Sequence, residues 1–296
     1  MTDGTRSPYL GPHVVGQRIV VRRLVPGETG PTGGPAFTDV LGICVAWDPC
    51  VVQTDRGTVT IPLAEIVSGK PVPPRPSVRL RASVAECESH VATLWSSVAV
   101  TPVGAWQVRS ATSVPRKRAN SCLAVVDPGL PLAEAVAAVR RVSGPGARLL
   151  HVEADSSLEA DLLALGCGPA GGESAFMLAG VSRALRAGGR PTASADLSPS
   201  GSHASASIGG GCDPIAEAQA TVDGDWIGIR EVLVDPGHRR QGLARAVVAG
   251  LLEWGLEQGA RTAWLHVEED NVAERALYES LGFVEHHRMR YLTLPD

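Results

Sequence analysis

The sequence has few lysines, few aromatic residues and no long apolar run. Lys70 and Lys117 are the only lysines among 27 basic residues, and Phe, Trp and Tyr together make up 4% of 296 residues. A core must therefore be built largely from Ala, Val and Leu. Neither a stretch of 18 apolar residues nor an N-terminal apolar run of signal-peptide type is present. These absences predict a cytoplasmic protein without a membrane partner.

Cysteine pairs and an excess of positive charge are also missing. The six cysteines form no C-x-x-C motif and have no histidine at metal-ligand spacing, which is typical of free thiols in a reducing compartment. His286 and His287 are adjacent, but no third ligand is near them in sequence, so we predict no metal site. The net charge of -4 and the pI near 6.1 argue against a dedicated nucleic-acid binder.

Composition divides the chain into an N-terminal part and a longer remainder. Several short β-type runs lie between residues 13 and 70, which predicts a small all-β barrel preceded by a tail, over residues 1–72. A proline-rich segment at 70–76 marks the best domain boundary. A second break, rich in Ala, Ser, Gly and Pro, predicts a flexible linker over residues 182–202.

The remainder contains an internal repeat. Val126-Asp127-Pro128-Gly129 recurs as Val234-Asp235-Pro236-Gly237, and Leu150-His151-Val152-Glu153 recurs as Leu265-His266-Val267-Glu268, in the same order. Each copy has the pattern strand, helix, strand, helix, strand. The predicted fold class is therefore α/β (α+β), with tandem mixed sheets and flanking helices over residues 77–181 and 203–296 after the small barrel. A spatial two-fold relation between the copies is consistent with this pattern.

The copies differ where a ligand would bind. The second copy inserts His238-Arg239-Arg240-Gln241-Gly242 between a strand and a helix, where the first copy has only Leu130-Pro131. Backbone N–H groups at such a helix start suit a phosphate or pyrophosphate, and a glycine lets the backbone approach the anion. The second copy also has Asn271 and, seven residues later, Tyr278.

These features together resemble a known family. The series Arg239-Arg240-Gln241-Gly242-Leu243-Ala244 resembles the R-x-x-G-x-G/A acyl-CoA loop of the GNAT superfamily of N-acetyltransferases. Asn271 followed by Leu277-Tyr278-Glu279-Ser280-Leu281-Gly282-Phe283 resembles the last conserved block of that superfamily. The resemblance covers residues 203–296 clearly. Residues 77–181 look like a degenerate GNAT repeat, and the whole arrangement resembles an actinobacterial subgroup.

The resemblance implies an acetyl-CoA-dependent N-acetyltransferase in which a primary amine attacks the thioester directly. Tyr278, a phenol protonated at neutral pH, would be the general acid, and Glu231 is the candidate general base. The implied contacts with acetyl-CoA are Val232, Leu233, Val234, Arg239, Arg240, Gln241, Gly242, Leu243, Ala244, Asn271 and Tyr278. His266 has a counterpart, His151, in the degenerate copy, so a structural role is favoured for it.

Several alternatives remain open at this stage. Tyr278 could be a core aromatic residue and Asn271 a helix N-cap, and the chain could be a non-catalytic acyl-CoA sensor. GNAT domains usually carry helices between their first two strands, but here the low-complexity segment stands in their place. The wall of the acceptor pocket would then be reduced, supplied by the first repeat, or supplied by another chain in a homo-oligomer. The acceptor itself, a small-molecule or protein amine, stays undefined.

Overall fold

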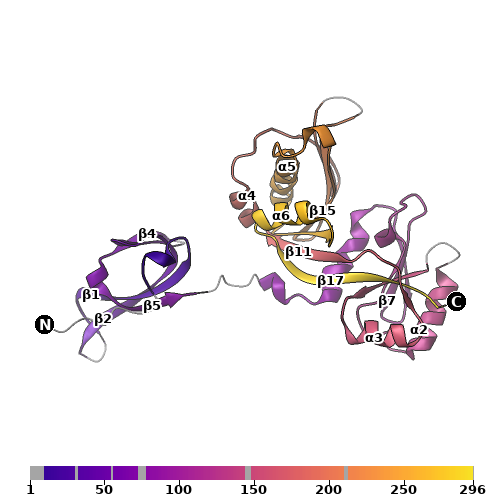
Figure 1. Ribbon diagram of the computed structural model, residues 1–296, viewed down its shortest axis with the longest axis horizontal. Helices are drawn as coiled ribbons and strands as arrows, with labels where there is room; N and C mark the ends of the chain where they lie inside the picture. Colours follow the sequence, from indigo (N-terminus) through magenta and orange to yellow (C-terminus); the bar gives the residue numbers. More distant parts are fainter. Residues whose placement is uncertain are drawn as a thin grey trace. The chain divides into compact units, whose positions relative to one another are not determined.

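The computed structural model describes residues 10–30, 33–54, 56–72, 78–143, 148–209 and 213–295. The chain divides into two compact units, residues 1–76 and 77–296 (Figure 1). Asp55 and Cys212 lie outside the described residues. None of the helices in the described ranges is long and apolar enough to cross a membrane.

The first unit is a small antiparallel β structure. Its strands are β1 (Arg18–Thr29), β2 (Pro35–Ala46), β3 (Cys50–Thr54), β4 (Gly57–Ile61) and β5 (Ile66–Pro71), in the sheet order β4-β3-β2-β1-β5. Alternate residues point inward, as the period of a strand requires. Val14, Ile19, Val21, Cys44 and Val52 are among the residues of its core. The N-terminal all-β domain predicted from the short β-type runs is thus present.

The second unit is built around one continuous sheet. Its order is β12-β13-β14-β15-β16-β11-β17-β9-β8-β7-β6, with β10 (Gly168–Pro169) paired to β17. The N-terminal half of the unit supplies β6 (Ala99–Val103), β7 (Trp106–Ser110), β8 (Cys122–Leu123), β9 (Leu149–Glu153) and β11 (Ser174–Gly180), with helices α2 (Leu132–Val142) and α3 (Ser157–Ala164). The C-terminal half supplies β12 (Asp196–Ser200), β13 (His203–Ile208), β14 (Ala216–Asp223), β15 (Trp226–Val234), α5 (Leu243–Glu257), β16 (Thr262–Glu268), α6 (Val272–Ser280) and β17 (Val284–Thr293).

The two repeats have equivalent local structures. β8 pairs with β9 in parallel, and β15 pairs with β16 in parallel. Each parallel pair is separated by a crossover helix, α2 in the first repeat and α5 in the second. The repeated Asp-Pro-Gly turns also match, because the carboxylates of Asp127 and Asp235 each accept a hydrogen bond from the glycine N–H two residues later.

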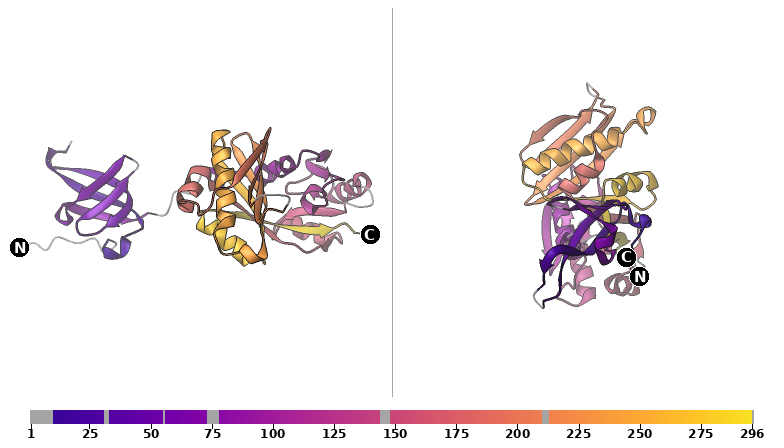
Figure 2. Two further views of the ribbon diagram at one scale, coloured as in Figure 1. Left: turned by 90° about the horizontal axis from the view of Figure 1, so that it is seen from above. Right: turned by 90° about the vertical axis from the view of Figure 1, so that its left-hand side faces the viewer.

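The repeats exchange their last strands. β11 ends the first repeat but lies between β16 and β17, and β17 ends the second repeat but also pairs with β9 of the first. In Figure 1, β17 runs beside β11 from the half of the unit that carries α5 and α6 to the half that carries α2, and Figure 2 shows the same unit from two further sides. Met177 of β11 is buried in the core of the second repeat, and Leu292 of β17 is buried in the core of the first. The ranges 77–181 and 203–296 are therefore halves of one unit and not separate domains.

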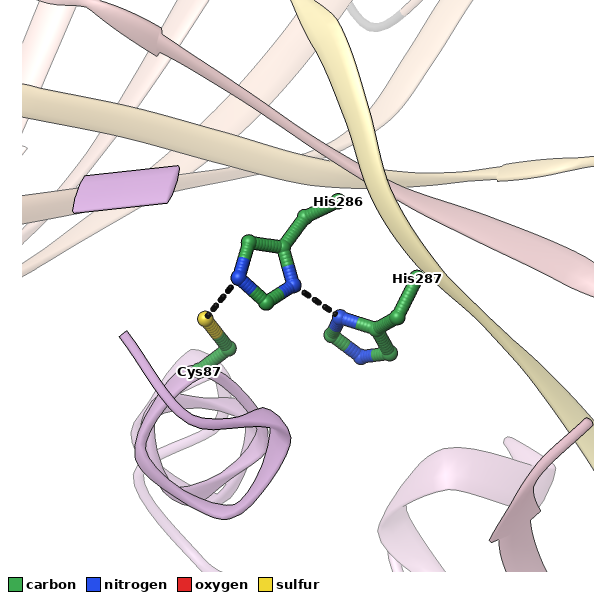
Figure 3. Close-up of side chains that lie close together, drawn as sticks. All are labelled: Cys87, His286 and His287. Atoms are coloured by element: carbon green, nitrogen blue, oxygen red, sulfur yellow. Dashed lines mark hydrogen bonds between the residues drawn. The ribbon is translucent and has the colours of Figure 1, made fainter. Parts of the chain in front are cut away.

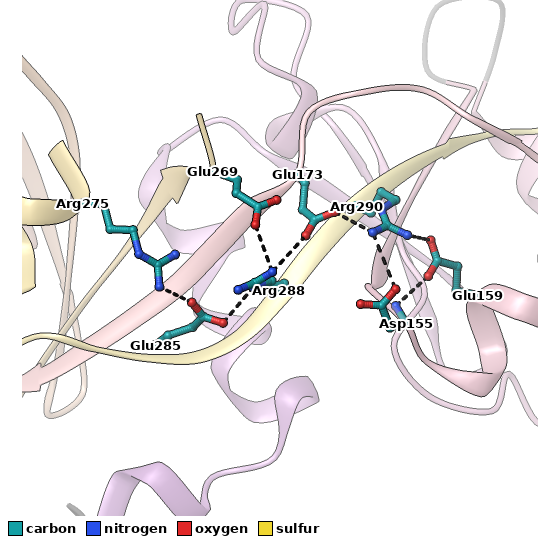
Figure 4. A network of polar contacts seen from close by, with 8 residues as sticks. All are labelled: Asp155, Glu159, Glu173, Glu269, Arg275, Glu285, Arg288 and Arg290. Atoms are coloured by element: carbon teal, nitrogen blue, oxygen red, sulfur yellow. Dashed lines mark hydrogen bonds and ion pairs between the residues drawn. The ribbon is translucent and has the colours of Figure 1, made fainter. Parts of the chain in front are cut away.

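Charged side chains cover the exchanged strands. Arg290 on β17 donates hydrogen bonds to Glu159 at 2.8 Å and to Glu173 at 2.6 Å, and Arg288 donates to Glu269 at 2.9 Å (Figure 4). Glu159 lies on α3, while Glu173 directly precedes β11. The network ties elements of the first repeat to the final strand of the second.

The prediction of a flexible linker over residues 182–202 is wrong, because this segment contains regular secondary structure. Residues 182–202 contain most of helix α4 (Val181–Gly188) and all of strand β12, which pairs with β13. Ala193 and Ala195 pack against the core beside α5, where the Cβ of Ala195 would lie 3.6 Å from a Cβ on Gly250. Small residues are thus used here for close packing against a helix, which composition alone cannot distinguish from a linker.

Among the residues that the structure describes, the C-terminal repeat has no helix between β12 and β13, and short helices from the N-terminal half of the unit pack on its sheet instead. Residues 78–94 form η3 (Val78–Arg81), α1 (Val84–Ser89) and η4 (His90–Leu94). η4 packs on β14 and β15, and the carbonyl of Leu94 accepts a hydrogen bond from Arg230 Nε at 3.0 Å. His90 Nδ1 lies 2.7 Å from the carboxylate of Asp223. Of the three alternatives for the wall of the acceptor pocket, this packing favours supply by the first repeat.

Candidate functional site

A cavity of about 640 Å³ lies between β15 and the start of α6. Most of the residues that the GNAT resemblance assigns to acetyl-CoA line it. These are Val232, Leu233, Val234, Arg239, Arg240, Gly242, Leu243, Ala244 and Asn271. Gln241 and Tyr278 are not among the residues that line this cavity. We refer to it below as the cofactor groove.

The loop before α5 has an unusual backbone. Arg240 has a φ of 61° and Gly242 a φ of 80°, both in the left-handed region. Gly242 is the residue before the helix, and no side chain among the described residues caps the first turn of α5. The start of α5 lines the groove, and the first N–H groups of a helix have no partner within the helix, which is the arrangement that binds phosphate groups.

Gln241 holds the loop in place through its backbone. Its carbonyl accepts a hydrogen bond from the Thr192 hydroxyl at 3.1 Å. A Cβ on Gly242 would lie 2.8 Å from the same hydroxyl oxygen, so a larger residue does not fit without movement. Thr192 lies in the segment that composition had marked as a linker. That segment thus supports the loop of the cofactor groove.

A bulge in β15 opens the neighbouring side of the groove. The register against β14 shifts between Arg230 and Leu233, and Glu231 has a φ of 53°. β15 and β16 pair in parallel at residues 226–228, before the bulge. Bulges bend a strand and redirect its side chains. Simple alternation of side chains between two faces therefore does not describe this part of β15.

A second cavity of about 580 Å³ adjoins the cofactor groove. Val232, Leu233 and Glu274 line both. Its other walls include Leu94 at the end of η4 and the next residue, Trp95. The basic residues of the lining are Arg116, Lys117 and Arg118. Glu231, Glu268 and His266 also face it. We refer to it as the acceptor cavity, after the GNAT resemblance, which implies that an acceptor amine lies beside the thioester.

Glu231 is already engaged by two arginines. Oε1 accepts a hydrogen bond from Arg116 at 3.1 Å, and Oε2 accepts one from Arg230 at 2.8 Å. Both carboxylate oxygens therefore have cationic partners. To take a proton from an amine, Glu231 would have to break or share one of these ion pairs.

Asn271, Glu274 and Tyr278 form one hydrogen-bonded chain along α6. Asn271 caps the helix by accepting from the Glu274 N–H, and its amide donates to Glu274 Oε2 at 2.6 Å. The Tyr278 hydroxyl donates to Glu274 Oε1 at 2.6 Å. Tyr278 is 1% exposed, so its hydroxyl connects to both cavities through Glu274.

Burial has the largest effect on the pKa values of Tyr278 and Glu274. It raises the pKa of Tyr278, and the adjacent Glu274 carboxylate raises it further, so the phenol stays protonated. Burial also raises the pKa of Glu274, against the opposing hydrogen bond from Tyr278. Glu274 was not singled out from the sequence. The capping pattern Asn271-x-x-Glu274 and the four-residue spacing to Tyr278 are the signals that could have found it.

His266 faces the acceptor cavity and leads to a buried carboxylate. Its Nε2 lies 3.0 Å from Oε1 of Glu88, which is completely buried, and its Nδ1 lies 3.2 Å from the Ser174 hydroxyl. His151, its counterpart in the first repeat, lies 3.7 Å from the other oxygen of Glu88. Burial lowers the pKa of His266 to about 4, and nearby Arg118 lowers it as well. His266 is therefore neutral at neutral pH.

The chain matches known acetyltransferases in part. Residues 198–292 match the family model described as "Probable histone acetyltransferase Rv0428c C-terminal", and residues 13–70 match "Rv0428c N-terminal Sm-like domain". The chain is 48% identical over 54 residues to the [Ribosomal protein bS18]-alanine N-acetyltransferase of Escherichia coli (strain K12), covering 18% of this chain and 36% of that protein. The chain is 34% identical over 64 residues to the protein of that name from Haemophilus ducreyi, and this match covers 21% of this chain and 44% of that protein. The chain thus spans less than half the length of these curated relatives.

One solved structure resembles a larger share of the chain. A GCN5-related N-acetyltransferase from Kribbella flavida has a TM-score of 0.57 and 17% sequence identity, and the match covers 73% of this chain and 97% of that one. At this identity the likeness concerns the fold. It confirms the fold class predicted from the repeats and motifs.

Proposed function

We propose that the protein is a GNAT N-acetyltransferase that transfers an acetyl group from acetyl-CoA to a primary amine. The match of residues 198–292 to an acetyltransferase family model and the fold shared with a GCN5-related N-acetyltransferase support the proposal. The observation that carries the proposal is the uncapped start of α5, preceded by Arg239, Arg240 and Gly242 and open to the cofactor groove. This arrangement suits the pyrophosphate of coenzyme A, and the backbone of residues 232–234 lies along the same groove to receive the pantetheine arm.

The chemistry follows from the junction of the two cavities. The amine nitrogen attacks the thioester carbonyl, the C–S bond breaks, and the thiolate of coenzyme A takes a proton. Tyr278 is the proposed general acid, since burial keeps its phenol protonated. Its hydroxyl donates to Glu274, which lines both cavities, so it must turn from Glu274 toward the sulfur during transfer.

The amine must lose a proton before or during its attack. Glu231 is the proposed base from the sequence, and it faces the acceptor cavity while paired to two arginines. His266 is a second candidate, because it is neutral and faces the same cavity. The variants Glu231→Gln and His266→Gln separate the two, since the variant that lacks the base loses the rising limb of the pH–rate profile.

The proposal is tested by binding and turnover in the same preparation. Calorimetry is expected to show one acetyl-CoA bound per chain, because the second repeat alone carries the loop. Incubation with acetyl-CoA and a panel of amines, including amino acids, polyamines, aminoglycosides and peptides, is read by mass spectrometry for a gain of one acetyl group. Absence of acetyl-CoA binding contradicts the proposal. Binding without turnover on every amine supports the alternative, a non-catalytic acyl-CoA sensor.

A further inference from the structure

Two adjacent histidines on β17 point toward the same helix. The register between β11 and β17 shifts between Phe176 and Met177, so that His287 is opposite Phe176 and His286 is the extra residue of a bulge. In a regular strand the two side chains would point to opposite faces. Here both imidazoles lie beside α1, where Cys87 is found (Figure 3).

The outer nitrogen of each ring has an acceptor as its partner. His286 Nε2 lies 3.0 Å from the carbonyl oxygen of Ala82, and His287 Nε2 lies 3.1 Å from Oε1 of Glu88. A carbonyl or a carboxylate accepts a proton and does not donate one. Both Nε2 atoms therefore carry the hydrogen, which leaves a lone pair on each Nδ1.

The two Nδ1 atoms face each other at a distance of 2.7 Å. Two lone pairs at that distance repel, so either a proton shared in a hydrogen bond or a metal ion lies between them. Cys87 Sγ completes the cluster, 4.0 Å from His286 Nε2, and one donor atom from each of the three residues lies within 4.8 Å of the other two. Cys87 is completely buried, and His286 is half-buried, which leaves a route to solvent.

We propose that Cys87, His286 and His287 bind a zinc-class divalent metal ion, with one ring nitrogen of each histidine and the Cys87 thiolate as ligands. Imidazole and thiolate are the ligands that Zn²⁺ prefers, and three protein ligands leave a fourth position for water. Zinc bonds of about 2.0 to 2.3 Å require small rotations of the side chains to bring sulfur and nitrogen together.

The surroundings match those of metal-binding histidines in other proteins. Such histidines donate their second ring N–H to a carboxylate or a backbone carbonyl, as His287 does to Glu88 and His286 does to Ala82. The sequence offered no third ligand, because Cys87 is 199 residues away from His286. A bound ion would fasten α1 to β17 and so hold the segment that forms a wall of the acceptor cavity.

The test uses the untagged full-length protein, stripped of metal by a chelator and dialysed. Elemental analysis after incubation with Zn²⁺ is expected to give one ion per chain, and Co²⁺ is expected to give d–d bands and a thiolate-to-cobalt charge-transfer band. Cys87→Ser should remove the charge-transfer band, and His286→Asn should weaken Co²⁺ binding at least tenfold. Cys167→Ser, which changes another buried thiol, is the matched control and should bind as the parent does.

Two results overturn the proposal. One is that the parent protein retains no Zn²⁺ or Co²⁺ at micromolar concentrations. The other is that the charge-transfer band persists in Cys87→Ser, which would place the metal at another thiol. If Cys87→Ser does not fold, His286→Asn is the deciding variant, because it changes a half-buried side chain and retains the Cys87 thiol. Unchanged Co²⁺ affinity in His286→Asn contradicts the site.

Discussion

At the scale of single residues, the Tyr278 hydroxyl is the group on which the proposed chemistry depends. Replacing it by Phe removes one oxygen from a ring that packs against Phe283 and leaves the rest of the core unchanged. We expect Tyr278→Phe to lower kcat by about 100-fold, as the loss of a general acid does, while acetyl-CoA binding changes little. Steady-state kinetics with calorimetry measure both, and an unchanged kcat would reject the role of Tyr278.

Gly242 is required by the backbone of the loop. Its positive φ and the nearby Thr192 hydroxyl disfavour any Cβ, at a cost of about 1 to 3 kcal/mol. We expect Gly242→Ala to weaken coenzyme A binding by at least tenfold. Gly250→Ala, inside α5 and with ordinary van der Waals space, is the matched control and should bind normally. Equal affinities of the two variants would show that the loop geometry does not govern binding.

His151 makes stability depend on pH. Burial lowers its pKa well below the usual value; Glu88 opposes this shift, and His266, Arg109 and Arg118 add to it. Below pH 6.5 the unfolded chain binds a proton at this residue that the folded protein does not, so stability falls as the pH falls. The effect reaches about 1.4 kcal/mol per pH unit.

The corresponding measurement is urea unfolding at pH 7.5 and 5.5. His151→Phe keeps a ring to stack on Tyr291 but cannot titrate, so the loss of unfolding free energy between the two pH values should be about 1 kcal/mol smaller than in the parent. The same loss in both proteins would mean that His151 does not contribute to acid sensitivity.

At the scale of elements, sequence patterns predicted the helices and strands better than they predicted which strands pair with each other. The strand–helix–strand pattern is present, because apolar periodicity acts locally, and the left-handed Gly282 follows the end of α6 at Ser280. The exchange of β11 and β17 was not predictable, since an apolar strand carries no information on which of two similar neighbours it will pair with. For the same reason Leu94 and Trp95 could not be assigned to the acceptor cavity from the sequence.

In the candidate site too, residues that are close in sequence could be grouped from the sequence, and residues that are distant in sequence could not. The loop could be predicted as one cluster because its residues are consecutive, and nine of the eleven residues predicted to contact acetyl-CoA line one groove; that they bind the cofactor stays a prediction. Glu88 could not be found, because its three histidine neighbours, His151, His266 and His287, are distant in the chain. The linker prediction failed because small residues that pack closely on α5 have the same composition as a flexible segment.

Arg290 is the residue of β17 that holds the exchanged strands to the first repeat. Its guanidinium donates to Glu159, which is 4% exposed, and to Glu173. We expect Arg290→Met to lower the free energy of unfolding by about 2 kcal/mol, since a buried carboxylate loses its charged partner. Arg288→Met, a more exposed neighbour, is the control and should cost less than about 1 kcal/mol. Equal effects in chemical denaturation would contradict a special role for Arg290.

At the scale of the whole molecule, the second unit behaves as one structure with one proposed cofactor site. Its sheet is continuous from β12 to β6, and the fully buried Glu88 and its histidine neighbours join both repeats to α1. The degenerate repeat therefore serves the second in two ways. It supplies walls of the acceptor cavity, through Leu94, Trp95 and Arg116, and it supplies the strand that completes the sheet.

The strand exchange predicts how fragments of the chain fold. A fragment of residues 203–296 retains the acetyl-CoA motifs but lacks β11, so the strands β16 and β17 lose the partner between them and the apolar core loses Ala175, Met177 and Ala179. Unpaired strand edges and an open core favour aggregation over folding. We expect this fragment to be insoluble or to give a poorly dispersed amide NMR spectrum. Residues 77–296 contain both exchanged strands and should unfold in a single calorimetric transition. A well-dispersed spectrum and acetyl-CoA binding by the shorter fragment would show that the exchange is dispensable, and that the second repeat is a domain in its own right.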